Sequence, residues 1–204
     1  MARPSNKDVR REQIVDGLRR VMARKGYERA TIAAIAEAAG LTTGLVHYHF
    51  KSKQAILLEL VDRLAGGLQQ RYETLAGEAA PEDRLAAFID SHLSTGEGAD
   101  AEAVACWVTI GSEALRQPEV GEVYRRLMGR QRDHLVELLG SLPTPPDCPE
   151  EAAAAILAAI EGCYQLAAAA PELVPRGFAA RSLRAMTAGL LAGRGNSVQR
   201  TDPS

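Results

Sequence analysis

The sequence predicts an all-α protein of about nine helices, in which a small N-terminal helical domain precedes a larger one. Apolar residues recur at spacings of three and four along most of the chain, and no run of alternating apolar and polar residues marks a strand. Aromatic residues form only 4% of the 204 residues and alanine is abundant, a composition that favours helices over sheets.

The expected helices follow one another through short connections. They cover residues 9–25, 32–39, 43–49, 53–76, 81–95, 101–116, 119–140, 150–170 and 178–192. Thr31, Thr42 and Ser52 are suitable N-caps for the second, third and fourth helices. Gly40 separates the second helix from the third by a tight turn, and two short helices joined in this way are typical of a helix-turn-helix.

The long fourth helix connects the two parts of the chain without an obvious hinge. Apolar residues repeat along it at every fourth position, namely Ile56, Leu60, Leu64, Leu68 and Tyr72. Gly66 and Gly67 are its weak point, because two glycines cost a helix about 2 kcal/mol relative to alanine.

Charge is divided unevenly along the chain. Residues 1–60 carry 11 lysines and arginines against 6 acidic residues, a net charge of +5, whereas the other 144 residues carry 13 against 20, a net charge of −7. A basic N-terminal part on an acidic body predicts that this part faces a polyanion such as nucleic acid.

Composition also favours a cytoplasmic location without a membrane partner. The three cysteines are too few for a disulfide framework, and their odd number favours a reducing compartment. The N-terminus lacks the apolar stretch of a secretory signal. Half of residues 151–170 are alanine, and Glu161 and Gln165 interrupt the segment, so a buried helix is favoured over a membrane span.

The third helix has the properties of a helix that reads DNA. A helix over residues 42–49 rises by roughly 12 Å, which suits a major groove about 12 Å wide. Val46 and Phe50 are spaced to anchor it, while its other side chains can donate hydrogen bonds or make apolar contacts and none is acidic. The simpler alternative is an ordinary surface helix that happens to carry aromatic residues.

The segment ATIAAIAEAAGLTTGLVHYHFKSKQAIL closely resembles the DNA-binding domain of TetR-type transcriptional regulators. The resemblance covers about residues 9–60 and rests on several features together. These are Thr31 at the start of the second helix, the Ala39-Gly40 turn, Gly44, the run from Tyr48 to Phe50, and Lys51 and Lys53 before the fourth helix.

The resemblance implies a role for each residue of the DNA-binding surface. Thr43, Gly44 and His47 are expected to face base edges, and Leu45 a thymine methyl. The residues expected to contact phosphates are Thr31, Thr42, Tyr48, His49 and Lys53, since hydroxyls and helix N-termini suit phosphate oxygens. Position 43 is often lysine and position 47 often tyrosine in this family, so the operator sequence is not predicted.

The rest of the chain resembles, more loosely, the regulatory domain of the BetI-type branch of that family. The resemblance divides the chain into a DNA-binding domain (1–50), a ligand-binding and dimerisation domain (51–193) and a tail expected to be disordered (194–204). It implies a homodimer through the last two helices, with apolar contacts from Ile156, Ile160, Leu183, Met186 and Leu190. These residues also fit a simple domain core.

The resemblance further implies a pocket for an unknown small-molecule effector between the middle helices. The candidate lining residues are Phe88, His92, Cys106, Trp107, Ile110, Glu113, Met128, His134, Cys163 and Tyr164. A single tryptophan in an apolar helix also suits an ordinary core position.

No catalytic, cofactor-binding or metal-binding arrangement is recognised. His47 and His49 diverge on a helix, and the cysteines lack metal-binding spacing. The sequence therefore predicts a regulator, most simply a repressor that a small molecule releases from a near-palindromic operator. Two alternatives remain open: a constitutive DNA-binding regulator without an inducer, and a helical small-molecule-binding enzyme or carrier. Ligand, operator sequence, target genes and the choice between repression and activation are not predicted, nor is whether two dimers share one operator.

Overall fold

The computed structural model describes residues 5–93 and 101–192, and in these ranges it is entirely helical. The elements are α1 (Asn6–Lys25), α2 (Ile32–Ala39), α3 (Thr43–His49), α4 (Lys53–Ala76), α5 (Pro81–Leu93), α6 (Ala101–Ala114), α7 (Pro118–Gly140), α8 (Pro149–Ala169), the 3-10 helix η1 (Pro171–Leu173) and α9 (Phe178–Ala192). The predicted all-α class is confirmed. The tail predicted over residues 194–204 lies outside the described residues.

Side-chain caps define the short helices of the N-terminal part. Thr31 accepts a hydrogen bond from the Ala34 N–H at 3.1 Å, and Thr42 accepts one from the Leu45 N–H at 3.3 Å. Gly40 ends α2 in the left-handed region (φ 66°), a conformation that favours glycine. α2 and α3 therefore form the expected helix-turn-helix, which α1 packs against.

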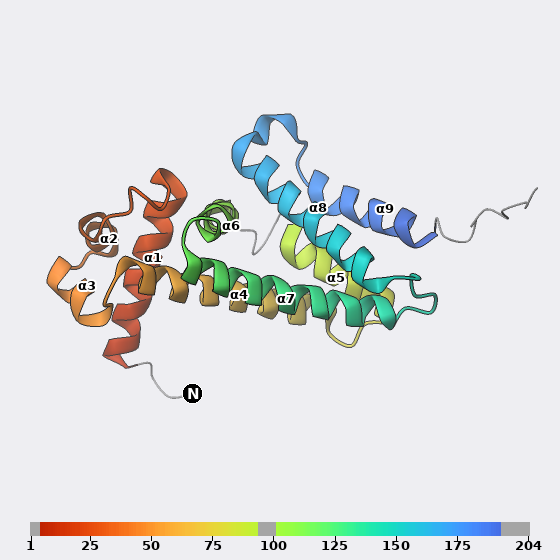
Figure 1. Ribbon diagram of the computed structural model, residues 1–204, viewed down its shortest axis with the longest axis horizontal. Coiled ribbons are helices and arrows are strands. Elements are labelled where there is room, and N and C mark those ends of the chain that lie inside the picture. Colours follow the sequence, from red (N-terminus) through yellow and green to blue (C-terminus); the bar gives the residue numbers. More distant parts are fainter. Residues whose placement is uncertain (1–4, 94–100, 193–204) are drawn as a thin grey trace, which may run out of the picture.

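The body is built around α4 and α7, which run beside each other along the length of the molecule (Figure 1). α5 packs along α4, while α6 and α8 pack against α7. α9 packs on α5 and α8 at the end away from α1–α3. α4 is continuous through Gly66 and Gly67, so these glycines do not interrupt it.

A single hydrophobic core runs through both parts of the chain. It extends from Ile14 in α1 to Leu183 in α9. α1 packs directly on α6, where the Cys106 thiol donates to the Arg19 carbonyl at 3.6 Å and the Arg19 guanidinium lies 3.5 Å from Glu102. The boundary at residue 50 remains a prediction, since the start of α4 contributes to this shared core.

Candidate DNA-binding surface and effector cavity

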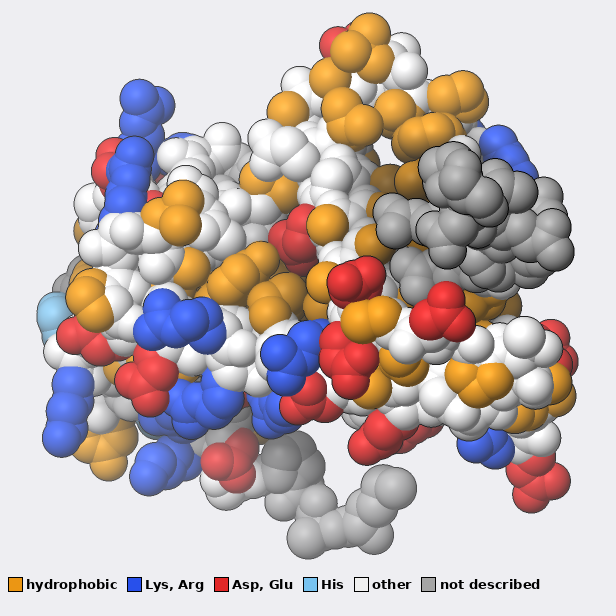
Figure 2. Space-filling view, turned by 45° about the vertical axis from the view of Figure 1, so that its right-hand side comes forward, with side chains coloured by type: hydrophobic (Ala, Val, Ile, Leu, Met, Phe, Trp, Pro, Cys, Tyr) orange, Lys and Arg blue, Asp and Glu red, His pale blue; other side chains and the backbone are white. Residues whose placement is uncertain are grey.

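The recognition helix α3 presents an exposed face. Val46 and Phe50 are buried and hold the helix on the core, as their spacing predicts. Thr43, Gly44 and His47 are exposed, and Tyr48 is 79% exposed. Figure 2 shows lysine and arginine side chains gathered on the side of the molecule that carries α1–α3. This surface can therefore meet a polyanion.

Gly44 leaves a gap on that exposed face. A β-carbon built there would meet only the Thr42 hydroxyl oxygen, at 4.0 Å, so nothing in the protein requires glycine at this position. Its backbone φ is also not positive. The absent side chain therefore leaves the backbone of α3 open on its outer face.

Three predicted phosphate contacts have additional roles in the structure. The hydroxyls of Thr31 and Thr42 cap helices but remain exposed, so their O–H groups can still donate outward. Lys53 is half-buried: its ammonium donates to the Tyr27 carbonyl at 2.9 Å and lies 4.1 Å from the centre of the Tyr27 ring. A contact from Lys53 to phosphate would compete with this packing.

A chain of polar contacts joins the end of the recognition helix to the middle of α4. Arg11 donates to the His49 carbonyl at 2.9 Å and stacks over the Phe50 ring at 4.2 Å. The same guanidinium pairs with Glu59, which also accepts from Arg63 at 2.8 Å. We call this series from His49 through Arg11 and Glu59 to Arg63 the polar relay.

Arg63, at the far end of the polar relay, lines a partly open cavity of about 290 Å³ between four helices. We call it the four-helix cavity. Its wall is formed by residues of α4, α5, α6 and α8, namely Arg63, Leu64, Gly67, Leu68, Arg71, Ser91, His92, Ala103, Val104, Trp107 and Tyr164. The volume is at the lower end of the range of about 300–1,000 Å³ typical of small-molecule sites.

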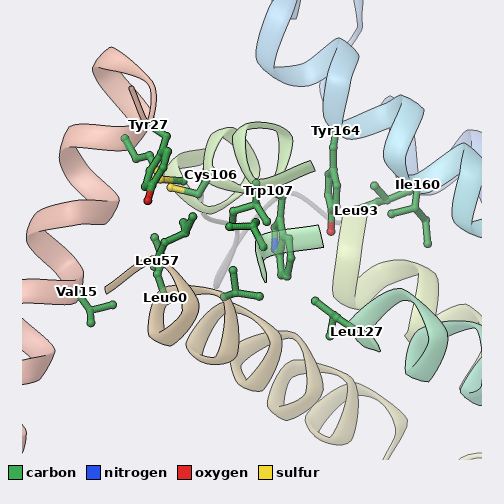
Figure 3. Close-up of a cluster of buried hydrophobic side chains, with 14 of the residues drawn as sticks. Val15, Tyr27, Leu57, Leu60, Leu93, Cys106, Trp107, Leu127, Ile160 and Tyr164 are labelled. Carbon is green, nitrogen blue, oxygen red and sulfur yellow. The ribbon is translucent and has the colours of Figure 1, made fainter. Parts of the chain in front are cut away.

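Two of the predicted ligand residues, Trp107 and Tyr164, line the four-helix cavity from α6 and α8. Figure 3 shows both side chains within the buried hydrophobic cluster. They also line a small adjoining void of about 10 Å³, together with Met128 and Glu161. The Tyr124 hydroxyl donates to Glu161 at 3.2 Å, and burial raises the pKa of the Glu161 carboxyl. A larger groove of about 580 Å³ lies between α4 and α7. Four of its eight described lining residues are exposed, so it is less suited to enclose a ligand.

The histidines of the predicted pocket belong to one aromatic cluster. The Phe88 ring lies 4.6 Å from the His92 ring and 5.5 Å from the His134 ring, and Tyr72 lies 4.6 Å from His134. Burial lowers the pKa of His92 to about 4, although a hydrogen bond from Nδ1 to the Phe88 carbonyl at 2.9 Å opposes the shift. His92 is therefore neutral near pH 7.

Of the ten predicted lining residues, three line the four-helix cavity (His92, Trp107 and Tyr164) and Met128 lines the adjoining void. The other six line neither: Phe88, Cys106, Ile110, Glu113, His134 and Cys163. Cys106 points toward α1 and Tyr27, because successive helical residues point about 100° apart and Trp107 takes the direction of the cavity (Figure 3). Glu113 also lies on that side, where it accepts a hydrogen bond from the Gln117 amide at 2.7 Å. Burial of the Tyr27 hydroxyl is the main cause that raises the pKa of Tyr27 to about 12, and the negative charge of Glu113 adds to it. Ile110 is a core residue, and Cys163 lies outside the cavities described above.

The predicted dimer residues fall into two groups, one buried inside the protomer and one accessible at its surface. Ile156, Ile160 and Leu183 are at most 3% exposed within one chain, so they belong to the protomer core and cannot supply surface to a second copy. Met186 is 62% exposed, and Leu190 is half-buried. The outer faces of α8 and α9 instead carry small side chains, namely Ala154, Ala155, Ala158, Gly162, Ala185, Ala188 and Gly189.

Sequence reasoning missed the cationic residues of this region. Arg63 and Arg71 lie at the same helical register as Gly67, at i, i+4 and i+8, and all three line the cavity. That spacing is readable in the sequence, but charged residues on a long helix are usually solvated. Nothing in the sequence marks Glu59 as the group that joins Arg11 to Arg63.

An exposed recognition helix, fused to a helical body with an internal cavity, defines a DNA-binding transcriptional regulator. Residues 14–60 match the family model described as bacterial regulatory proteins, tetR family. Residues 81–192 match the model for the C-terminal part of BetI-type transcriptional repressors. The chain belongs to the tetR family of regulators, in its BetI-type branch, and it is a regulator rather than an enzyme.

Relatives and solved structures agree with this assignment. The chain is 32% identical to an HTH-type transcriptional regulator BetI of Rhizobium meliloti over 76% of each chain, and 31% identical to that of Agrobacterium fabrum over 76% of this chain and 75% of the other. A Rhodococcus transcriptional regulator has the same fold, with a TM-score of 0.80, 24% identity, and coverage of 92% and 99% of the two chains. A putative regulator from Saccharomonospora viridis, solved in complex with choline, has a TM-score of 0.75 at 23% identity and covers 92% and 97%.

Proposed function

We propose that the protein is a cytoplasmic homodimeric repressor that leaves a near-palindromic operator when a small molecule occupies the four-helix cavity. The observation that carries this proposal is the position of α4. Its first turns pack into the core beneath the helix-turn-helix, and its middle turns line the cavity. A ligand that displaces α4 therefore moves the recognition helix.

The polar relay gives this movement a specific route. Arg63 faces the cavity, and Arg11 holds the carboxyl end of α3 through the His49 carbonyl. Two recognition helices must be about 34–36 Å apart to enter successive major grooves. A small rotation of each α3 in a dimer changes that separation and lowers operator affinity.

The dimer is proposed to form through the outer faces of α8 and α9. Gly162 and Gly189 have open space where a β-carbon would be, and small side chains let the helices of two copies approach closely. α8 is also the one helix among the described residues that is long and apolar enough to cross a membrane. Its inner side packs in the core, and we assign its exposed apolar side to the second copy.

The experiment is fluorescence anisotropy of the protein with DNA from upstream of its own gene, against a scrambled duplex, at two salt concentrations. We expect tight binding to the upstream DNA alone. The affinity should fall as the salt concentration rises, because binding releases cations from the DNA and added salt opposes that release. A library of small molecules is then screened for release. Equal weak binding to both duplexes would contradict the prediction that the upstream DNA contains the operator. Tight binding that no compound alters would favour a constitutive regulator.

A further inference from the structure

The charged side chains that line the four-helix cavity are all positive. Arg63 and Arg71 both belong to its wall, and no aspartate or glutamate is among the described lining residues. They are separated by two helical turns, or about 12 Å of rise, with Gly67 between them. His92 adds no negative charge, since it is neutral near pH 7.

The charge of Arg71 reaches other groups of the cavity wall. Burial is the main cause of the lowered pKa of His92, on α5, and Arg71 adds to it; burial raises the pKa of Tyr164, on α8, and Arg71 partly opposes that rise. Arg71, His92 and Tyr164 all line the four-helix cavity, so the positive charge of α4 faces side chains of α5 and α8 across it.

The remaining wall is apolar and has room for the body of a ligand. Gly67 has nothing within 4 Å of the place where its β-carbon would be, so the wall between the two arginines is open. Leu64, Leu68 and the Trp107 ring provide an apolar surface beside it. A guanidinium presents a planar set of donors that matches a carboxylate.

Two carboxylates lie beside this wall, and neither lines the four-helix cavity. Glu161 lines the adjoining void rather than the four-helix cavity, and it accepts a hydrogen bond from Tyr124. Glu59 pairs with Arg63 from the side of the polar relay, so an incoming anion competes with Glu59 for that guanidinium. This competition would connect occupation of the cavity to Arg11 and α3.

We infer that the effector is an organic anion, with its carboxylate between Arg63 and Arg71 and an apolar body against Trp107. The inference rests on the proposed function, because it names the chemical class that the four-helix cavity takes.

The experiment compares three compounds of similar shape and different charge: phenylacetate, phenylacetamide and benzyltrimethylammonium. Trp107 is the only tryptophan of the chain, so its fluorescence reports binding at the cavity. We expect phenylacetate to bind at least tenfold more tightly than the other two compounds. Arg71→Gln and Arg63→Gln should each reduce that preference, while leaving phenylacetamide binding unchanged.

The matched control is Arg130→Gln, which removes an exposed arginine from the separate groove between α4 and α7 and should keep the preference for phenylacetate. Preference for the cation or the amide, retained preference in both cavity variants, or no binding of any compound would overturn the inference. Operator affinity, measured in parallel, separates the two proposals. Selective binding of phenylacetate without release of DNA supports the inference and contradicts ligand-controlled release.

Discussion

Gly17 lies where α1 packs tightly against α2. A β-carbon at this position would meet the Ile35 carbonyl oxygen at 2.7 Å and the Ala39 β-carbon at 3.1 Å. We therefore expect Gly17→Ala to lower the free energy of unfolding by about 1–3 kcal/mol, because the backbone of α2 must shift. Gly66→Ala, whose β-carbon meets nothing within 4 Å, is the matched control and should raise stability by about 0.5–1 kcal/mol. Urea unfolding measures both, and equal effects would contradict this packing.

His92 predicts how stability depends on pH. Its pKa in the folded protein is about 4, below the ordinary 6.5, so the unfolded chain binds more protons between these values. Stability is then highest above pH 6.5 and decreases as pH falls toward 4, with a loss of about 2 kcal/mol between pH 7 and pH 5. Burial also lowers the pKa of His134, which acts in the same direction.

Chemical unfolding at pH 7 and pH 5 tests this prediction. His92→Gln should reduce the difference in stability between the two pH values, because it removes the buried group that titrates. His47→Ala removes an exposed histidine and should leave the difference as it is in the natural chain. The assignment to His92 fails if its variant shows the full pH dependence.

At the scale of elements, the recognition helix separates two kinds of DNA contact. Tyr48 is 79% exposed, and we assign it to phosphate, so Tyr48→Ala should weaken binding to all sequences alike. His47 is exposed on α3, and we assign it to a base edge, so His47→Ala should relax preference at one base step by about 1–3 kcal/mol. Anisotropy with a set of singly substituted operators measures both effects. The roles are contradicted if Tyr48→Ala changes preference at one base or His47→Ala changes none.

The elements also show what sequence reasoning can predict. The starts of α2 and α3 were predictable because Thr31 and Thr42 have hydroxyls that suit an N-cap, and both N-cap hydrogen bonds are present in the structure. α1 begins three residues earlier than the predicted residue 9, since Ser5 caps it by accepting from the Asp8 N–H. η1 was not predicted, because three residues carry no periodicity.

The cavity was predictable only in part. Trp107 and Cys106 are neighbours in an apolar helix, and nothing local decides which of them faces the cavity and which faces α1. Arg63 and Arg71 resemble solvated helix charges until the fold places them against α5, α6 and α8. Ile156 appears equally suited to a core and to an interface, and only the packed protomer shows that it is buried. Such choices depend on tertiary contacts that periodicity does not contain.

The proposed dimer has a direct test. Met186 is 62% exposed on α9, so Met186→Arg should place a charge at the proposed contact between copies and dissociate the dimer. Because two half-sites must be held together, operator affinity should fall with it. The control is Leu115→Arg, which changes a 90% exposed residue directly after α6 and should leave the protein dimeric. Light scattering distinguishes the two species, and a dimeric Met186→Arg protein would place the interface elsewhere.

The single core shared by α1–α3 and the body has an evolutionary consequence. Cys106 contacts α1, and its neighbour Trp107 lines the four-helix cavity. We therefore expect a change in the cavity wall to shift α1, against which α3 packs. Under the proposed function, we expect a lineage that adapts this cavity to a new compound also to change how tightly the unliganded protein binds its operator. New chemical sensitivity and the resting level of gene expression are then inherited together, and second substitutions on the DNA-facing surface are needed to separate them.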